Sequence, residues 1–235
     1  MKIRDQKERH VRVTATEINK IKTRKKVLSL LVAAGMTLLI MMYMIAAIYK
    51  ETGSFTININ KYEMVEYGLS LSETADLSHP TSVLNAKINH SITNIAGEEI
   101  PDNVDNIDGE HNGKNYIAYT FYLVNAGETN KVSYQWQVKM NNITNDIDEA
   151  VRLTLYIDGV PTTYAKTASD GSGPEPGTTE FYSSDVLALG RRDNFTSGST
   201  TKFTIVLWLE GTDPDCVDWI KGGSMRLEMF IEIVH

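Results

Sequence analysis

A run of 23 uncharged residues, 27–49, constrains this chain more than any other feature of its sequence. As a helix it would be roughly 34 Å long, because each residue advances an α-helix by about 1.5 Å. The hydrocarbon core of a bilayer is about 30 Å thick. The run therefore predicts a transmembrane signal-anchor helix at 27–49, which divides the chain into a tail at 1–26 and an ectodomain at 50–235.

The distribution of charge predicts the orientation of this helix. Residues 1–26 contain ten Lys or Arg and three Asp or Glu, whereas the residues beyond 49 contain 13 basic and 27 acidic ones. Basic flanks stay on the cytoplasmic side, and the cluster at 22–26 lies next to the helix. We expect a cytoplasmic tail that touches membrane lipid headgroups and an acidic domain on the extracellular side.

A cleaved secretory signal is the alternative to a retained anchor. The apolar part of such a signal is usually about 7–15 residues long and ends at a small-x-small site. This run is longer, and the bulky Met44 and Ile45 lie three residues before a cut at Ala46 or Ala47. We therefore favour a single-pass anchor, while cleavage near Ala47 would give a secreted protein.

Composition limits the partners and the compartment of the ectodomain. Its acidic balance argues against nucleic acid, because phosphate binding requires a basic surface. Cys216 is the only cysteine, so no intrachain disulfide can form. A domain of about 185 residues can hold together by its core alone. The absence of disulfides favours a Gram-positive bacterial cell surface.

Beyond residue 50 the apolar residues alternate with polar ones, as they do in half-buried β-strands. From this pattern, from apolar runs and from turn residues, the predicted strands are 55–60, 64–72, 83–95, 115–125, 131–140, 151–157, 160–165, 181–189, 199–210 and 224–234. Segment 115–125 is apolar on both faces, which is typical of a central strand. Many strands with short turns and little helix predict an antiparallel β-sandwich of the jelly-roll type.

Turn residues predict how some of these strands connect. Ala126–Glu128 separates 115–125 from 131–140, and we expect these two strands to form an antiparallel hairpin. Asp158-Gly159 is a strong two-residue hairpin signal between 151–157 and 160–165. We also expect a helical turn near 145–150 and a loop at 168–179, where Gly and Pro are frequent.

Two acidic segments have the carboxylate density that Ca²⁺ prefers. The first holds Asp102, Asp105, Asp108 and Glu110, but it does not match the EF-hand spacing, and a solvated loop is the interpretation we favour. The second holds Glu210, Asp213, Asp215 and Asp218. These four residues are the calcium candidates of the sequence, although turn and cap roles are again the interpretation we favour. No other cofactor is predicted.

Enzymatic motifs do not stand out in the sequence. The five histidines show no paired spacing of the zinc-hydrolase kind, and no serine lies in a G-x-S-x-G motif. Cys216 has no histidine near it in the sequence to act as a base. We therefore expect a protein that is not an enzyme.

Three features together resemble the TasA/camelysin-like secreted proteins of Gram-positive bacteria. They are Lys25-Lys26 before the long apolar segment, the strand-forming GSFTININ at 53–60, and the block WLEGTDPDC at 208–216 before the last strand. The resemblance implies a jelly-roll domain, removal of the leader by a signal peptidase, and assembly into biofilm matrix fibres. In such fibres the first strand of one subunit completes the sheet of the next, and residues 55–60 would be the donated strand.

Two hypotheses about function follow. The leading one is a non-enzymatic, membrane-anchored cell-surface or matrix structural protein, which associates with itself or with other surface proteins. The alternative is a surface module that binds carbohydrate or peptide. Its aromatic side chains would come from the candidates Tyr116, Tyr119, Tyr122, Tyr134 and Trp136, although strand positions of this kind mostly fill the core.

Overall fold

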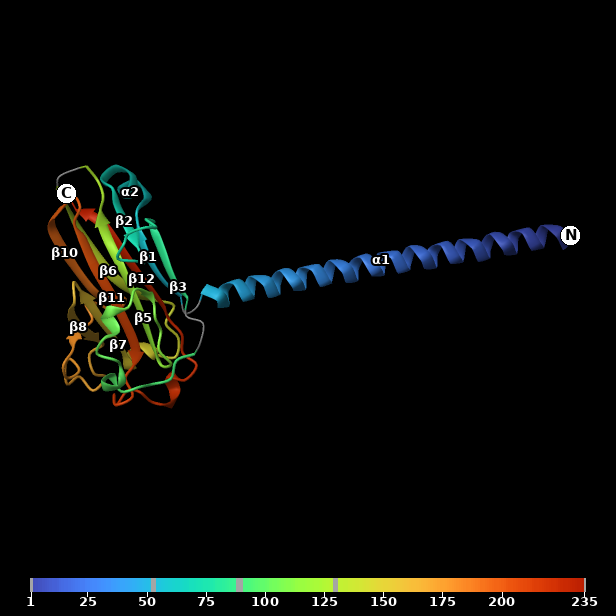
Figure 1. Cartoon of the computed structure of the whole chain (residues 1–235). Coiled ribbons are helices and arrows are strands. Elements are labelled where there is room, and N and C mark those ends of the chain that lie inside the picture. Colours follow the sequence, from blue (N-terminus) through green and yellow to red (C-terminus); the bar gives the residue numbers. More distant parts are fainter. Residues whose placement is uncertain (1, 52–53, 88–90, 129–130, 235) are drawn as a thin grey trace. The chain divides into compact units, whose positions relative to one another are not determined.

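The structure is a computed structural model that describes residues 2–51, 54–87, 91–128 and 131–234. Within 2–51 it describes the side chains of 19–44. The chain divides into two compact units, with the boundary in the sequence between Lys50 and Glu51 (Figure 1). The first unit is a single helix, and the second is a domain built from β-strands.

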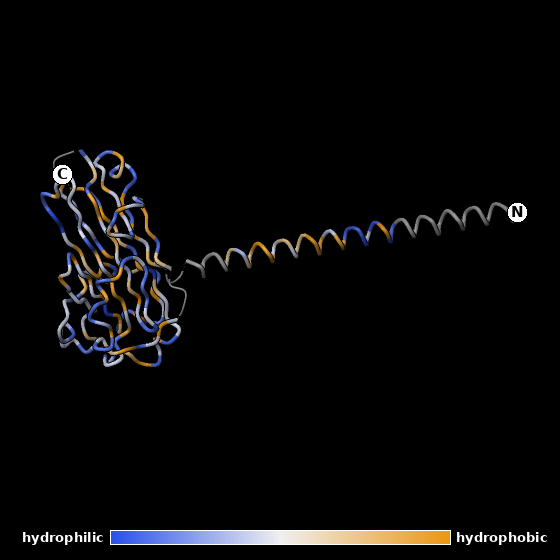
Figure 2. Tube along the Cα trace, in the orientation of Figure 1, coloured by the Kyte–Doolittle hydropathy of each residue, from blue (hydrophilic) through white to orange (hydrophobic). Residues whose placement is uncertain are grey.

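The first unit is the helix α1 (Lys2–Glu51). The basic tail is thus helical from Lys2 onward and continuous with the apolar segment. Asn19–Met44 is long and apolar enough to cross a membrane, and none of it is buried. Figure 2 shows hydrophilic residues followed by hydrophobic ones along this part of the helix. By length and composition this segment can act as a membrane anchor or as a signal sequence.

The second unit contains two sheets. Sheet A has the strand order β10 (Val186–Thr196), β6 (Lys131–Asn141), β12 (Arg226–Val234), β1 (Ser54–Ile59) and β3 (Val83–Lys87). Sheet B has the order β2 (Leu69–Ser72), β5 (Tyr116–Asn125), β11 (Thr200–Leu209), β7 (Val151–Ile157), β8 (Val160–Ala165) and β9 (Thr179–Glu180). The short β4 (Gly109–Glu110) also pairs with β5.

This arrangement confirms the predicted jelly-roll-like β-sandwich preceded by one apolar helix. Consecutive strands repeatedly change sheet, so that sheets A and B are built from interleaved parts of the sequence. Two strand pairs are parallel rather than antiparallel, namely β1 with β12 and β8 with β9. The first strand of the domain therefore lies beside its last strand.

The core lies between the two sheets and is rich in aromatic rings. Phe121 of β5 stacks on Phe203 of β11 with ring centroids 5.2 Å apart. Trp136 of β6 meets the Phe203 ring edge-on from the other sheet. From β1 the side chains of Phe55 and Ile57 are almost completely buried. Such large buried side chains supply most of the apolar surface that folding removes from water.

The predicted strand at 64–72 is only half correct, because its first part belongs to the helix α2 (Lys61–Tyr67). The Asn60 side chain accepts a hydrogen bond from the backbone N–H of Tyr62 at 3.0 Å and so caps the start of this helix. Gly68 ends it with a positive φ of 71°. The caps outweigh the alternating pattern, and Val65 is left 86% exposed.

The predicted hairpin between 115–125 and 131–140 is wrong. Both strands exist as β5 and β6, but they lie in different sheets: β5 pairs with β2, β4 and β11, whereas β6 pairs with β10 and β12. Alternation of apolar residues shows which face of a strand is buried but does not choose its neighbour. The chain therefore continues from β5 in sheet B to β6 in sheet A, and the two strands do not pair with each other.

The other predicted elements agree with the structure to different degrees. The hairpin of β7 and β8 is confirmed, and both turn residues, Asp158 and Gly159, have positive φ. The helical turn near 145–150 is confirmed as a 3₁₀ turn at Ile147–Ala150. The strand predicted at 83–95 ends at Lys87 in the described part, and 88–90 lie outside the described residues. The strand predicted at 181–189 is displaced toward the C-terminus and forms β10.

Candidate functional site

The outer face of sheet B carries a second set of packed side chains, on the side away from the main core. Along β11 the alternate residues Val206 and Trp208 point to this face, and along β7 Arg152, Thr154 and Tyr156 do so. The register places Trp208 directly beside Arg152 and Val206 directly beside Thr154. Together these side chains form a surface with two aromatic rings, a hydroxyl group and one positive charge. We call this surface the floor.

Three loops rise around this floor and enclose a groove of about 790 Å³, which we call the outer groove. One wall is the segment 97–102, which includes a 3₁₀ turn at Gly97–Glu99 and the apolar Ile100. The opposite wall is the segment 168–178 between β8 and β9. Residues 212–215, after β11, close one end. A groove of this volume is large enough for a small organic ligand or part of a chain.

The closed end of the outer groove contains a buried ion pair. Arg152 Nη2 lies 2.5 Å from Asp213 Oδ2 and 3.5 Å from Glu175 Oε2. The side chains of Arg152 and Asp213 are 5% and 0% exposed, and that of Glu175 is 11% exposed. The guanidinium of Arg152 thus faces two carboxylates and lies closer to that of Asp213.

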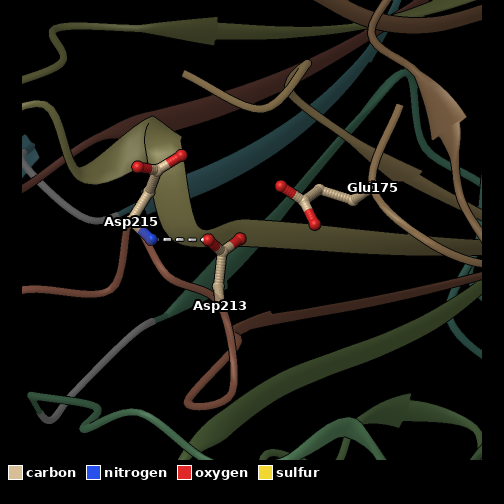
Figure 3. Close-up of side chains that lie close together, drawn as sticks. All are labelled: Glu175, Asp213 and Asp215. Carbon is tan, nitrogen blue, oxygen red and sulfur yellow. Dashed lines mark hydrogen bonds between the residues drawn. The ribbon is translucent and has the colours of Figure 1, made fainter. Parts of the chain in front are cut away.

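A third carboxylate completes this acidic end. Single oxygens of Glu175, Asp213 and Asp215 lie within 4.8 Å of one another. Figure 3 shows the Glu175 carboxylate facing the other two, with the Asp215 backbone N–H donating to Asp213 Oδ1 at 2.8 Å. Asp215 itself accepts hydrogen bonds from the backbone N–H and the hydroxyl of Ser169. The loop 168–178 is thereby fastened to the segment after β11.

The electrostatics of Glu175 differ from those of its neighbours. Burial raises the pKa of the Glu175 carboxyl, and the negative charge of Asp213 raises it further. The positive charge of Arg152 offsets only part of both effects. The ionised form of Glu175 is therefore less stable here than in water.

Glu210, one of the four calcium candidates, lines the outer groove but has a structural role. Its Oε2 accepts hydrogen bonds from Trp208 Nε1 and from the Gly97 backbone N–H, both at 3.0 Å. Its Oε1 accepts two more from the backbone N–H and the hydroxyl of Thr212. Burial opposes ionisation, but these hydrogen bonds outweigh it and lower the pKa of Glu210. Glu210 holds the wall segment 97–102 against the floor.

The structure brings together only part of the predicted calcium set. Asp213 and Asp215 converge, whereas Asp218 has a side chain that is 93% exposed and is paired with Lys221. In the first acidic segment the carboxylates serve separate contacts. Asp105 pairs with Lys202, and Asp108 accepts a hydrogen bond from Tyr122. Calcium binding stays a prediction. Among the described residues, the carboxylate that lies close to Asp213 and Asp215 is that of Glu175.

The aromatic residues suggested for ligand binding lie mostly elsewhere. Tyr119, Tyr134 and Trp136 are buried in the core between the sheets. The aromatic side chains that line the outer groove are Tyr156 and Trp208 instead. Trp208 is 6% exposed, so Tyr156 presents the larger ring surface of the two.

Arg152 and Glu175 are the residues of this site that sequence reasoning missed. Arg152 is the only charged residue in the apolar strand VRLTLYI, and a charge on such a strand signals a buried partner. Glu175 lies between Pro174 and Pro176 in a loop otherwise rich in Gly and Ser. Two prolines restrict the backbone around a single acidic residue, which is a weak signal for a fixed carboxylate.

Comparison with known proteins adds little to this description. No protein-family model matches the chain, and no curated protein matches it. Among solved structures, a β-glucosidase from Kluyveromyces marxianus in complex with glucose is similar at 11% identity, with a TM-score of 0.24. The match covers 68% of this chain and 15% of the β-glucosidase chain. A likeness at this level carries no argument about function.

Proposed function

We propose that the chain is a non-enzymatic structural protein of a bacterial cell surface or extracellular matrix. In this proposal the apolar segment 27–49 anchors the chain, the basic tail 1–26 stays in the cytoplasm, and the β-domain lies outside. The charge distribution of the sequence and the exposed apolar residues of α1 support this arrangement.

The observation that carries the structural role is the position of β1. This strand begins at Ser54, three residues after α1 ends, and it lies inside sheet A between β12 and β3. β3 has no other partner in sheet A among the described strands. Phe55, Ile57 and Ile59 of β1 are buried in the core. One short segment at the start of the domain thus completes both the sheet and the core.

Such a strand is suited to exchange between copies. The β1 strand of a second copy would make the same hydrogen bonds to β12 and β3 and would fill the same core positions. Exchange of an identical element costs little free energy and joins subunits into dimers or chains. We infer that self-association through β1 builds the structural assembly, in line with the resemblance to TasA/camelysin-like matrix proteins.

Single-cysteine variants test this inference. Asn58 of β1 lies opposite Phe230 of β12, and both are half-buried. Copies with Asn58→Cys are mixed with copies carrying Phe230→Cys, all in a Cys216→Ser background, and are then oxidised. A disulfide between copies is expected only if β1 of one copy lies beside β12 of another, because the two Cα atoms must come within about 7 Å.

Two controls make the result decisive. In the first control, copies with Asn58→Cys are mixed with copies carrying Tyr182→Cys. Tyr182→Cys places an exposed thiol outside the strand pair, so no specific disulfide between copies should form. Asn58→Cys and Phe230→Cys in one chain should instead form an intrachain disulfide and block assembly. If mixed copies never crosslink while the intrachain disulfide forms readily, exchange of β1 is wrong.

The outer groove favours a second candidate function, a surface module that binds carbohydrate or peptide. Its support is the groove of about 790 Å³ with Tyr156, Thr154 and Thr163 on its floor. Retention of the protein on a column of cell-wall polysaccharide or peptide would support this function. If the Tyr156→Ala variant unfolds as the unaltered protein does but is no longer retained, the ligand binds in the outer groove.

A further inference from the structure

The outer groove contains a carboxylate whose hydrogen-bonding capacity is unused. The Glu175 side chain is 11% exposed and lines the groove. Within the part of the chain that the structure describes, its charged partner is Arg152 at 3.5 Å. Its two oxygens accept no hydrogen bond from the described residues. A largely buried carboxylate is ordinarily satisfied by several donors, so this one has room for a donor from outside.

The charge around Glu175 is also unbalanced. Arg152 is the only cation among the described residues that line the outer groove. Its guanidinium lies closer to Asp213, at 2.5 Å, than to Glu175, at 3.5 Å. The carboxylates of Asp215 and Asp170 add further negative charge to this end of the groove. Burial and the negative charge of Asp213 raise the pKa of Glu175, and the positive charge of Arg152 offsets only part of this rise.

We propose that the outer groove binds an arginine side chain from an extended segment of a partner protein, with its guanidinium on Glu175. A guanidinium presents a planar pair of N–H donors that matches the two oxygens of one carboxylate, of which Oε2 of Glu175 also faces Arg152 at 3.5 Å. The aliphatic part of the arginine would lie along the floor over Thr154 and Tyr156. This proposal specifies the ligand of the second candidate function and rests on it.

An organic cation fits this site better than a metal ion. Both oxygens of Asp213 already accept hydrogen bonds, from Arg152 and from the Asp215 backbone N–H. Both oxygens of Asp215 accept hydrogen bonds from Ser169. Ca²⁺ requires about six to eight oxygen ligands, which is more than these largely occupied carboxylates offer. The volume of the groove is far larger than an ion needs and suits a side chain with its flanking backbone.

Calorimetric titration of the full-length protein in nonionic detergent micelles tests the proposal. The probe is the tripeptide Gly-Arg-Gly with acetylated and amidated ends, and its matched control contains citrulline in place of arginine. Citrulline keeps the shape of the side chain but carries no charge. The arginine peptide should bind, and the citrulline peptide should bind about tenfold or more weakly, since a charge-assisted hydrogen bond contributes roughly 1.5–3 kcal/mol.

Two variants locate the binding. Glu175→Gln keeps the size of the side chain and should weaken binding of the arginine peptide by about tenfold or more. Glu98→Gln removes a carboxylate from the opposite wall of the same groove and should change affinity by less than about twofold. The unfolding transition of Glu175→Gln should match or exceed that of the unaltered protein, which excludes misfolding as the cause.

Each contrary outcome has a distinct meaning. Equal binding of the arginine and citrulline peptides, or full binding by Glu175→Gln, would overturn the proposal. Binding of CaCl₂ alone without binding of the peptide would make this end an ion site instead. If the cell-wall column still retains the protein while the arginine peptide fails to bind, only the ligand is wrong. If the column does not retain the protein and the arginine peptide does not bind, the second candidate function is wrong as well. Exchange of β1 is unaffected by any of these results.

Discussion

Arg152 Nη2 of β7 lies 2.5 Å from Asp213 Oδ2, and both side chains are almost fully shielded from solvent. This pair joins the floor of the outer groove to the segment that closes its end. Because the two charges are buried together, each depends on the other to avoid an uncompensated charge in a medium of low polarity.

Asp213→Asn should lower the free energy of unfolding by about 3–5 kcal/mol, because it removes the closest counter-charge of the buried Arg152 guanidinium. The guanidinium keeps the Val151 carbonyl oxygen at 3.3 Å and the Glu175 carboxylate at 3.5 Å. Urea unfolding followed by circular dichroism measures the loss. Lys221→Ala, which removes an exposed ion pair with Asp218, is the control and should leave the transition where it is. A loss below about 1 kcal/mol for Asp213→Asn would mean that the pair is solvated.

Ile57→Ala should lower the free energy of unfolding by about 2–5 kcal/mol, because Ile57 of β1 is fully buried between the sheets. Val65→Ala in α2 removes a side chain that is 86% exposed and should change stability by no more than about 0.5 kcal/mol. The comparison measures how firmly β1 is part of the core. Similar small effects at both positions would show that β1 leaves the sheet readily in the isolated protein.

Gly68→Ala should destabilise the domain by about 2 kcal/mol or more. Gly68 has a positive φ of 71°, and a Cβ there would lie 2.4 Å from the backbone of Gly127. Gly198→Ala provides a matched control, since Gly198 has a similar φ of 77° but open space around it. It should cost only about 1 kcal/mol, the cost of the backbone conformation alone. Equal losses in the two variants would show that the Gly68–Gly127 approach is unimportant.

Glu175→Gln should change the pH dependence of stability. The pKa of Glu175 is higher in the folded protein than in the unfolded chain, so its ionisation disfavours the folded state. Stability is therefore lost as the pH rises through the interval from the unfolded pKa to the folded one. Urea unfolding should show Glu175→Gln more stable than the unaltered protein at pH 7 and equal to it near pH 4. A variant that is less stable at pH 7 would mean that Arg152 stabilises the ionised carboxylate.

Changing Lys22, Arg24, Lys25 and Lys26 to Gln should disturb the orientation of the chain in a membrane. These residues form the basic cluster next to the apolar segment, and basic flanks are held in the cytoplasm. Protease added to intact cells should degrade the β-domain of the unaltered protein and spare it in a fraction of the variant. Domains that stay fully accessible in the variant would show that other features set the orientation.

The fold could be predicted largely because burial leaves a local signature. The alternation in the segments that became β6 and β12 marks one buried face per strand, and the helix 27–49 follows from an uninterrupted apolar run. The choice of strand partner leaves no such signature. β5 and β6 are consecutive in the sequence, yet β5 pairs with β11 and β6 pairs with β12. They lie in different sheets because each sheet buries its apolar face against the other.

The candidate site was harder to predict because its residues come from three separate segments. Asp213 and Asp215 were visible as part of an acidic segment after a strand. Glu175 joins them only because the loop after β8 folds back and is fastened by Ser169 to Asp215. Arg152 points to the outer groove because its neighbours Val151 and Leu153 face the core. Such tertiary juxtaposition depends on the register of β7 and β11, which the sequence does not state.

The parallel pairing of β1 with β12 has a consequence for the order of folding. Phe55 lies opposite Leu227, so two strands roughly 170 residues apart in the chain are neighbours in sheet A. A ribosome makes β1 first and β12 last, and throughout synthesis the apolar face of β1 has no finished sheet to enter. Folding of this domain is therefore held back until its C-terminal strand is available.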